Sequence, residues 1–222
     1  MDPRRYPPKK TKRHDTSSDS DEFVFGSRVT HTQQTKKTEN NALVLDYLPE
    51  GRDFGSKRRE PIIQCIGDKW FTLLEVVPRK PGEFSQFSEI QLPRSEKSDN
   101  GVIKYIKQRI TIDNLTNTAY NALEEAILRI VNKNERRFVA FFNRAQPITN
   151  RIHSLQLIPG IGKKLMWEFL QVRKQLPFVS FQDIEERVKI SDIRKMLVKR
   201  ILLELEGEEK HYLFTAGPEK GK

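Results

Sequence analysis

The hydrophobic residues in the first half of the chain fall into short runs interrupted by Gly and Pro, a pattern typical of β-strands. These runs occupy residues 42–48, 61–66 and 70–77. Gly67-Asp68 lies between the second and third runs and indicates a hairpin. Both faces of the third run are apolar, so we expect Trp70 and Phe71 to lie in the core.

Residues 102–112 give the clearest strand pattern, because apolar and polar positions alternate. The face assigned to the core carries Ile106, Ile110 and Ile112. The other face carries Tyr105, Lys107, Arg109 and Thr111. Several short strands within residues 39–113 predict a small antiparallel β-barrel. We favour an OB-like barrel, whose open sheet face stacks bases on aromatic side chains and follows the backbone with basic ones.

Helical spacing replaces the strand pattern in residues 114–146, which we expect to form connecting helices. Thr116 marks the first helix start. The apolar stripe of this helix consists of Ala119, Leu123, Ile127, Ile130 and Val131. The next helix carries Phe138, Phe141 and Phe142. These rings either stack bases or pack between the two domains, and we favour packing.

A tight turn at residues 159–162, with the sequence Pro-Gly-Ile-Gly, joins a short apolar helix to an amphipathic one. Glycine at positions 160 and 162 permits positive φ and removes the Cβ atoms that keep a ligand away from the backbone. Ile161 lies between them and is expected to pin the turn to the core. A plain helical hairpin has no need of this arrangement.

The amphipathic helix after the turn opens with Lys163 and Lys164. Its first backbone N–H groups have no intrahelical partner, and the positive end of the helix dipole lies behind them, so we predict an anion site. The sequence here resembles the helix-hairpin-helix motif, which holds nucleic-acid backbones through phosphates rather than bases. The resemblance rests on Leu155, Ile158, Pro159, Gly160, Ile161, Gly162, Phe169 and Leu170.

The spacing continues as in a tandem helix-hairpin-helix domain, which we assign to residues 147–207. Downstream matches are Arg173, Pro177, Phe178, Ser180, Phe181, Asp183, Ile184 and Val188. Residues 189–193 stand at the second turn without glycine, so the second hairpin is expected to keep its fold and lack the glycine anion site. The last helix is expected at 193–205 with Gly207 as its stop, followed by a strand and tail at 208–222.

Composition favours a polyanionic partner, because 40 Lys and Arg residues face 30 Asp and Glu residues and give a net charge of +10 over 222 residues. Nucleic acid fits better than a membrane, since no apolar run approaches the roughly 18 residues of a membrane span. Residues 1–38 hold few apolar side chains and are expected to form a disordered tail. The lone Cys65 excludes an internal disulfide. The N-terminus has no apolar signal core, so we expect a cytoplasmic protein.

The candidate nucleic-acid contacts fall into three groups of backbone, basic and aromatic positions. The hairpin candidates are Gly160, Ile161, Gly162, Lys163, Lys164 and Arg173. The barrel candidates are Arg58, Arg59, Lys69, Tyr105, Lys107 and Arg109. The candidates on the connecting helices are Arg136 and Arg137. The alternative interpretation is that the basic side chains are ordinary solvated residues of the protein surface.

A catalytic alternative comes from base-excision glycosylases, some of which carry a helix-hairpin-helix motif with a downstream catalytic Asp and a nearby Lys. Lys164 and Asp183 have nearly that separation. A helix start at Ser180 also explains Asp183, one cysteine is too few for an iron–sulfur cluster, and the four histidines are scattered. We therefore expect no catalysis, metal or cofactor.

Residues 42–214 resemble an uncharacterised archaeal family of predicted nucleic-acid-binding proteins, described by a domain of unknown function (DUF655-like). The resemblance implies an archaeal cytoplasm and leans toward RNA. We predict an α+β protein in which a small antiparallel OB-like barrel precedes an all-α tandem helix-hairpin-helix domain. Its expected role is non-catalytic binding of structured RNA, in the ribosome or in RNA processing, without a membrane or small-molecule partner. DNA binding in repair or recombination, or a protein-interaction scaffold, is the alternative.

Overall fold

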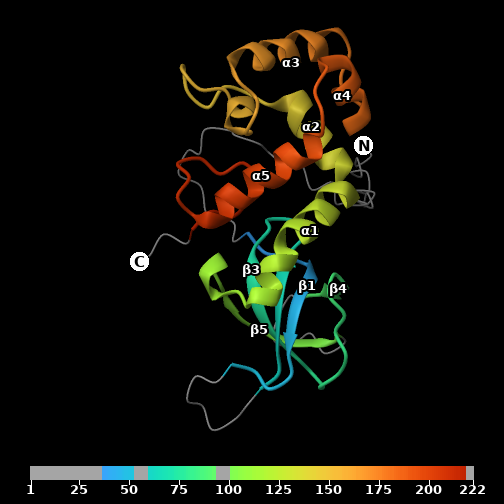
Figure 1. Ribbon diagram of the computed structural model, residues 1–222, viewed down its shortest axis with the longest axis vertical. Coiled ribbons are helices and arrows are strands. Elements are labelled where there is room, and N and C mark those ends of the chain that lie inside the picture. Colours follow the sequence, from blue (N-terminus) through green and yellow to red (C-terminus); the bar gives the residue numbers. More distant parts are fainter. Residues whose placement is uncertain (1–36, 53–59, 94–100, 219–222) are drawn as a thin grey trace, which may run out of the picture.

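The computed structural model describes residues 37–52, 60–93 and 101–218. The described chain has a curled antiparallel sheet at one end and a group of helices at the other (Figure 1), so the α+β prediction is confirmed. The strands are β1 (Asn41–Leu48), β2 (Ile62–Gly67), β3 (Leu73–Pro78), β4 (Glu89–Gln91) and β5 (Ile103–Arg109). The helices are α1 (Asn117–Lys133), α2 (Glu135–Arg144), α3 (Lys163–Gln175), α4 (Phe181–Val188) and α5 (Ile193–Glu206), with short 3-10 helices η1 (Ile112–Asn114) and η2 (Ser154–Leu157).

The sheet has five strands in the order β4-β1-β2-β3-β5, and its curl makes it a half-barrel with antiparallel neighbours. Side chains alternate between its faces, and both faces are apolar. Leu43 and Leu45 join the core shared with the helices, whereas Ala42 and Val44 join a second core on the opposite face. Burial on both faces explains why these strands lack an alternating sequence pattern.

The predicted hairpin between β2 and β3 is present, and the Glu39 carboxylate holds its turn. The Glu39 side chain accepts hydrogen bonds from the backbone N–H groups of Lys69 at 3.0 Å and Thr72 at 3.0 Å. Phe71 is fully buried, as expected. Trp70 is only partly buried and lies beneath the Lys37 ammonium group, 4.5 Å from the ring centroid. The core assignment was therefore correct for the phenylalanine and too strong for the tryptophan.

One expectation for β5 is wrong, because its alternation is interrupted. Ile106 pairs with Val76 while Gln108 pairs with Glu75, and the extra residue between them forms an irregularity in the ladder. Such a bulge moves the following side chains to the other face. A second irregularity lies between Ile103 and Tyr105. Along this strand Ile103 is buried, whereas Ile106 is 38% exposed.

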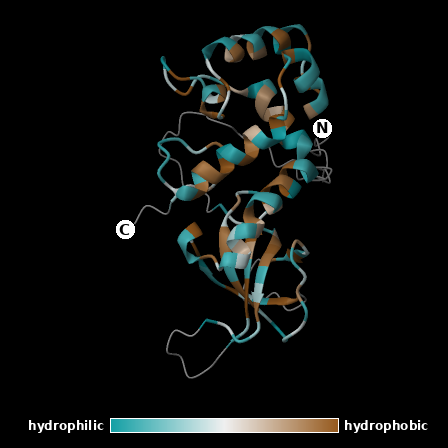
Figure 2. Ribbon diagram, viewed as in Figure 1, coloured by the Kyte–Doolittle hydropathy of each residue, from teal (hydrophilic) through white to brown (hydrophobic). Residues whose placement is uncertain are grey.

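Helix α1 connects the two ends of the molecule by packing on β1 and on α5. Thr116 caps its N-terminus, and its Oγ1 accepts from the Ala119 N–H at 3.0 Å. The predicted apolar stripe is buried. A single hydrophobic core continues from the sheet through α1 into α2 and α5, and Figure 2 shows hydrophobic residues along this path. The sheet and the helices therefore share one core and are packed directly together.

The phenylalanines of α2 pack inside the protein, which confirms the favoured interpretation. Phe138 and Phe142 are fully buried, and Phe141 is 1% exposed. The Phe142 ring stacks on Phe169 of α3 with 5.3 Å between centroids. Phe138 packs on Phe214 at 5.4 Å. These rings fix α2 between α3 and the C-terminal segment.

The expected C-terminal strand is absent from the described residues 208–218. The Glu204 carboxylate instead accepts hydrogen bonds from the backbone N–H groups of Leu213 at 2.7 Å, Phe214 at 2.9 Å and Thr215 at 2.9 Å. Glu204 also pairs with Arg200 at 2.8 Å, and both side chains are buried. One carboxylate thus supplies the acceptors that a neighbouring strand would otherwise provide.

We predict that Glu204→Gln lowers the free energy of unfolding by about 3 kcal/mol, because it leaves the Arg200 guanidinium in the interior with less compensation. Urea denaturation measures this change. Glu206→Gln is the matched control, since its side chain is in the exposed last position of the same helix. Equal stability of the two variants would contradict the structural role of Glu204.

A second stability prediction concerns His153, whose Nδ1 accepts the Leu155 N–H at 3.1 Å and caps η2. Burial, and then the charge of Arg173, lowers the pKa of this imidazole. The unfolded chain therefore binds a proton near pH 6.5 while the folded chain still excludes it, so stability falls as the pH drops below about 6.5.

Replacing His153 with Asn, which accepts the same hydrogen bond without titrating, should reduce the loss of stability between pH 7.5 and pH 5.5. Thermal unfolding at the two pH values tests this. His211→Asn is the control, because the backbone carbonyl of His211, rather than its ring, accepts from Arg200. A variant that loses as much stability as the wild type would exclude His153 as the titrating group.

Candidate nucleic-acid interface

The turn between η2 and α3 is fixed to the core at its centre and exposed at its glycines. Ile161 is 3% exposed, and its N–H donates to the Ile158 carbonyl at 3.0 Å. Gly160 and Gly162 are exposed. Ile161 therefore positions the turn, and its backbone N–H is already used within the turn rather than available to a ligand.

The two glycines serve different purposes. Gly160 has φ of +91°, and a Cβ there would lie 2.7 Å from Cε of Met196, so this position favours glycine for conformational reasons. Gly162 has φ of −78°, which any residue adopts, and a Cβ there would meet no atom within 4 Å. Local folding alone does not require glycine at 162, and its absent side chain leaves the start of α3 open.

The N-terminus of α3 carries no side-chain cap. Gly162 is the N-cap residue, and its carbonyl accepts the first intrahelical bond from Met166 at 2.9 Å. Within the described ranges, the N–H groups of Gly162, Lys163 and Lys164 have no hydrogen-bond partner. Both lysine side chains are exposed beside them. This arrangement offers donors and positive charge to an anion.

The second turn, between α4 and α5, is closed by the chain's own carboxylates. Asp192 caps α5 by accepting from the Lys195 N–H at 3.1 Å. Oε1 of Glu185 accepts from the Ile193 N–H at 2.9 Å. Side chains thus occupy the positions that an external anion would take, as expected for a turn without glycine. Of these two helix starts, the one at α3 is open.

Arg173 lies on α3 but points into the protein. Its guanidinium donates to the carbonyls of Phe142 at 2.7 Å and Ala145 at 2.8 Å, at the C-terminus of α2. Burial lowers its pKa. These bonds join α2 to α3 through the Arg173 side chain. Arg173 therefore has a structural role, unlike the exposed lysines of the turn.

The barrel candidates belong to the sheet half of the chain, and Figure 1 places the sheet at the other end of the molecule from α3. Arg58 and Arg59 are outside the described residues. The Tyr105 hydroxyl donates to Glu60 at 2.7 Å, and this bond, then burial, raises its pKa. Lys107 is exposed, Lys69 is half-buried, and Arg109 donates to the Lys37 carbonyl at 2.8 Å. Of the barrel candidates that the structure describes, none is brought together with the turn.

The two arginines of α2 differ in environment. Arg136 is exposed. The Arg137 guanidinium lies over the rings of Phe71, with 5.8 Å to the centroid, and Phe138, with 5.3 Å. Burial lowers its pKa to about 10. Arg137 thus packs at the junction of sheet and helices, and of the two it is Arg136 that faces solvent.

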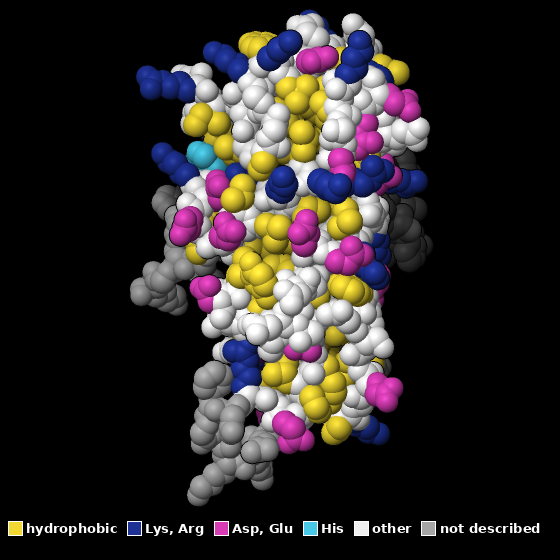
Figure 3. Space-filling view, viewed as in Figure 1, with side chains coloured by type: hydrophobic (Ala, Val, Ile, Leu, Met, Phe, Trp, Pro, Cys, Tyr) yellow, Lys and Arg dark blue, Asp and Glu magenta, His cyan; other side chains and the backbone are white. Residues whose placement is uncertain are grey.

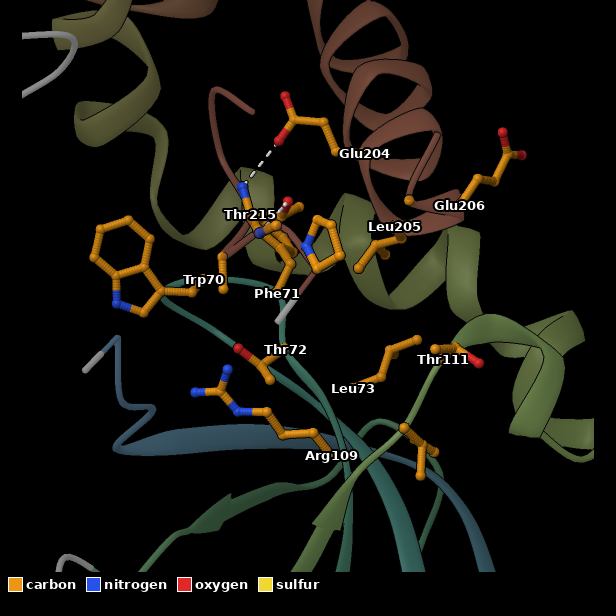
Figure 4. Close-up of a pocket in the computed structure, with 15 residues that line it drawn as sticks. Trp70, Phe71, Thr72, Leu73, Arg109, Thr111, Glu204, Leu205, Glu206 and Thr215 are labelled. Atoms are coloured by element: carbon orange, nitrogen blue, oxygen red, sulfur yellow. Dashed lines mark hydrogen bonds between the residues drawn. The ribbon is translucent and has the colours of Figure 1, made fainter. Parts of the chain in front are cut away.

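A cavity of about 390 Å³ lies between the start of β3, the end of β5 and the C-terminal segment (Figure 4). Glu204 lines it, and Figure 4 shows its bond to the Thr215 N–H. Arg109 lies on the opposite wall. The principal acidic group of the cavity is used to hold the C-terminal segment, so we assign the cavity to the junction between the two ends of the fold.

Lys164 and Asp183, the pair considered for glycosylase chemistry, lie on different helices. Oδ2 of Asp183 accepts from the Val179 N–H at 3.0 Å and pairs with Arg187 at 3.1 Å. Lys164 is exposed at the start of α3. Asp183 therefore stabilises the beginning of α4.

Among the described helices, none is both long enough and apolar enough to cross a membrane.

Sequence reasoning missed Trp167, which is 55% exposed on α3 one turn after Lys163. The helical period contains the signal, because Met166 and Phe169 occupy the core-facing side and leave Trp167 outside. The exposed face of α3 thus begins with lysines and continues with an aromatic ring.

Comparison with known proteins places this architecture in a family. Residues 38–216 match the family model described as "Protein of unknown function (DUF655)". "Uncharacterized protein MJ0038" of Methanocaldococcus jannaschii is 36% identical over 190 residues, which are 85% of each chain. The crystal structure of Af1531 from Archaeoglobus fulgidus, of the same family model, superposes with a TM-score of 0.71 at 40% identity and covers 80% of this chain and 100% of that one. The chain belongs to the DUF655 family.

Proposed function

We propose that this protein is a non-catalytic nucleic-acid-binding protein that grips the phosphate backbone of a double-helical segment. The observation that carries the proposal is the exposed, uncapped start of α3, where Gly162 leaves space and Lys163 and Lys164 supply charge. Backbone N–H groups and lysines bind phosphate oxygens without reading bases. Structured RNA is the preferred partner, in the ribosome or RNA processing, with DNA of repair or recombination as the alternative.

The proposal includes the assignment of residues 147–207 as a tandem helix-hairpin-helix domain. Its support is the repeated arrangement of two helices around a turn, first η2 and α3, then α4 and α5. Only the first helix start is open, so phosphate binding through a turn belongs to this one. The curled sheet is the part that we assign as OB-like, and its strand order is that of a barrel left open between β4 and β5.

We predict that Gly162→Asp weakens phosphate binding while preserving the fold. Aspartate is a favourable N-cap residue and would close α3 as Asp192 closes α5. Its carboxylate would also repel phosphate. Affinity for an RNA hairpin, measured by fluorescence anisotropy, should fall about tenfold to a hundredfold, since hydrogen bonds to charged groups contribute about 1.5–3 kcal/mol each.

Gly82→Asp is the matched control, because it makes the same charge change at an exposed glycine in the loop between β3 and β4. It should bind RNA nearly as the wild type does. Equal affinities of the two variants would exclude the start of α3 as the binding site. If the wild type binds neither RNA nor DNA and a protein copurifies stoichiometrically, the scaffold alternative gains support instead.

A further prediction concerns salt. Lys163→Gln and Lys164→Gln should each reduce the slope of log affinity against log salt concentration by about 1, since each removes one phosphate contact. Titrations between 50 and 200 mM salt provide the slopes. Lys107→Gln, at an exposed position of β5, tests whether the change in slope is specific to the lysines of α3. An unchanged slope in both α3 variants would contradict direct contact by these lysines.

A further inference from the structure

Trp167 is a large aromatic side chain that the fold leaves outside the core. It is 55% exposed, whereas its helix neighbours Met166 and Phe169 are 5% and 0% exposed. Among the described residues, the indole has no aromatic or cationic ring contact. Trp70, the other tryptophan in the sequence, is covered in part by Lys37. A single exposed aromatic is ordinary in a protein surface, so its surroundings decide its meaning.

The surroundings of Trp167 form a basic strip along α3. At 100° per residue, Lys163, Trp167, Gln171 and Lys174 lie within about 80° of one another around the helix axis. All of these residues are exposed, and none is acidic. Figure 3 shows mainly lysine and arginine side chains, with acidic ones among them, around apolar side chains at the end of the molecule where Figure 1 places α3. The charge of this strip is complementary to a polyanion rather than to another basic surface.

The distance along the helix matches the dimensions of a nucleic acid. Trp167 follows Lys163 by four residues, a rise of about 6 Å along the helix axis, and the phosphates of one strand in duplex DNA are about 3.4 Å apart along the duplex axis. A strand held by phosphate at the start of α3 would therefore place a base within two steps of the indole.

We infer that Trp167 is a stacking platform for an unpaired base next to the gripped double-helical segment. Bases inside a duplex are already stacked on both faces, so an external indole can stack only on a base that is unpaired or at an end. The inference rests on the proposed function. It narrows the ligand of this protein to a duplex RNA that continues into a single strand or loop.

The test compares Trp167→Ala with the wild type on two RNA probes, a blunt hairpin stem and the same stem with a short single-stranded extension. Affinity for the extended stem should fall about fivefold to a hundredfold, since stacking of one base contributes about 1–3 kcal/mol. Affinity for the blunt stem should change little. Trp167→Phe should recover most of the loss, because a smaller ring still stacks.

Leu176→Ala is the matched control, as Leu176 is 62% exposed at the C-cap of the same helix. It should bind both probes as the wild type does. In a Trp70→Phe background, Trp167 becomes the sole tryptophan, and its fluorescence should be quenched by the extended probe and not by the blunt one.

The outcomes separate this inference from the proposed function. Equal affinity of Trp167→Ala and wild type for the extended stem, or equal losses on both stems, would overturn the stacking role. If Gly162→Asp at the same time weakens both stems, the phosphate grip stands and the stacking inference alone is wrong. Failure of the wild type to bind either RNA stem or the same duplex made of DNA would overturn both.

Discussion

The buried pair of Arg200 and Glu204 holds together the parts of the helical end that lie far apart in the sequence. Arg200 donates to the Leu157 carbonyl at 3.1 Å, at the end of η2, and to the backbone of His211. Glu204 receives the N–H groups of the C-terminal segment. A buried ion pair costs desolvation and is by itself weak evidence of stability. Here its value is positional, because it fixes η2 directly before the turn that leads into α3.

The difference between the two helix starts follows from their sequences. At α5, Asp192 has φ of +54° and turns its carboxylate onto the first turn of the helix. At α3, the N-cap is a glycine without side-chain atoms, so nothing from the chain itself satisfies the first N–H groups. Exposed N–H groups can bond to water at little cost. The open start is therefore compatible with a stable fold and at the same time keeps unused hydrogen-bond donors for an anion.

The sequence alone was enough to predict the elements with a strong hydrophobic periodicity and the local structure of the turn. Thr116 and the stripe of α1 are where they were expected, and Ile161 is buried between two exposed glycines. The sequence alone was not enough to predict the features that long-range contacts determine. Ile106 is exposed on the edge strand β5, Glu204 replaces a strand partner at the C-terminus, and carbonyls at the end of α2 bind the Arg173 guanidinium. Each of these outcomes depends on a partner at least nine residues away, which no local pattern encodes.

Magnitudes indicate how many contacts the proposed site must supply. Micromolar affinity corresponds to about 8 kcal/mol, and each charge-assisted hydrogen bond contributes about 1.5–3 kcal/mol. The N–H groups at the start of α3 and the two lysines offer several such bonds, but strong hydration of an exposed ammonium places its contribution at the low end. The turn alone would therefore give weak binding. A stacked base on Trp167, at about 1–3 kcal/mol, would be the contact that converts a general attraction for phosphate into a preference for one class of RNA structure.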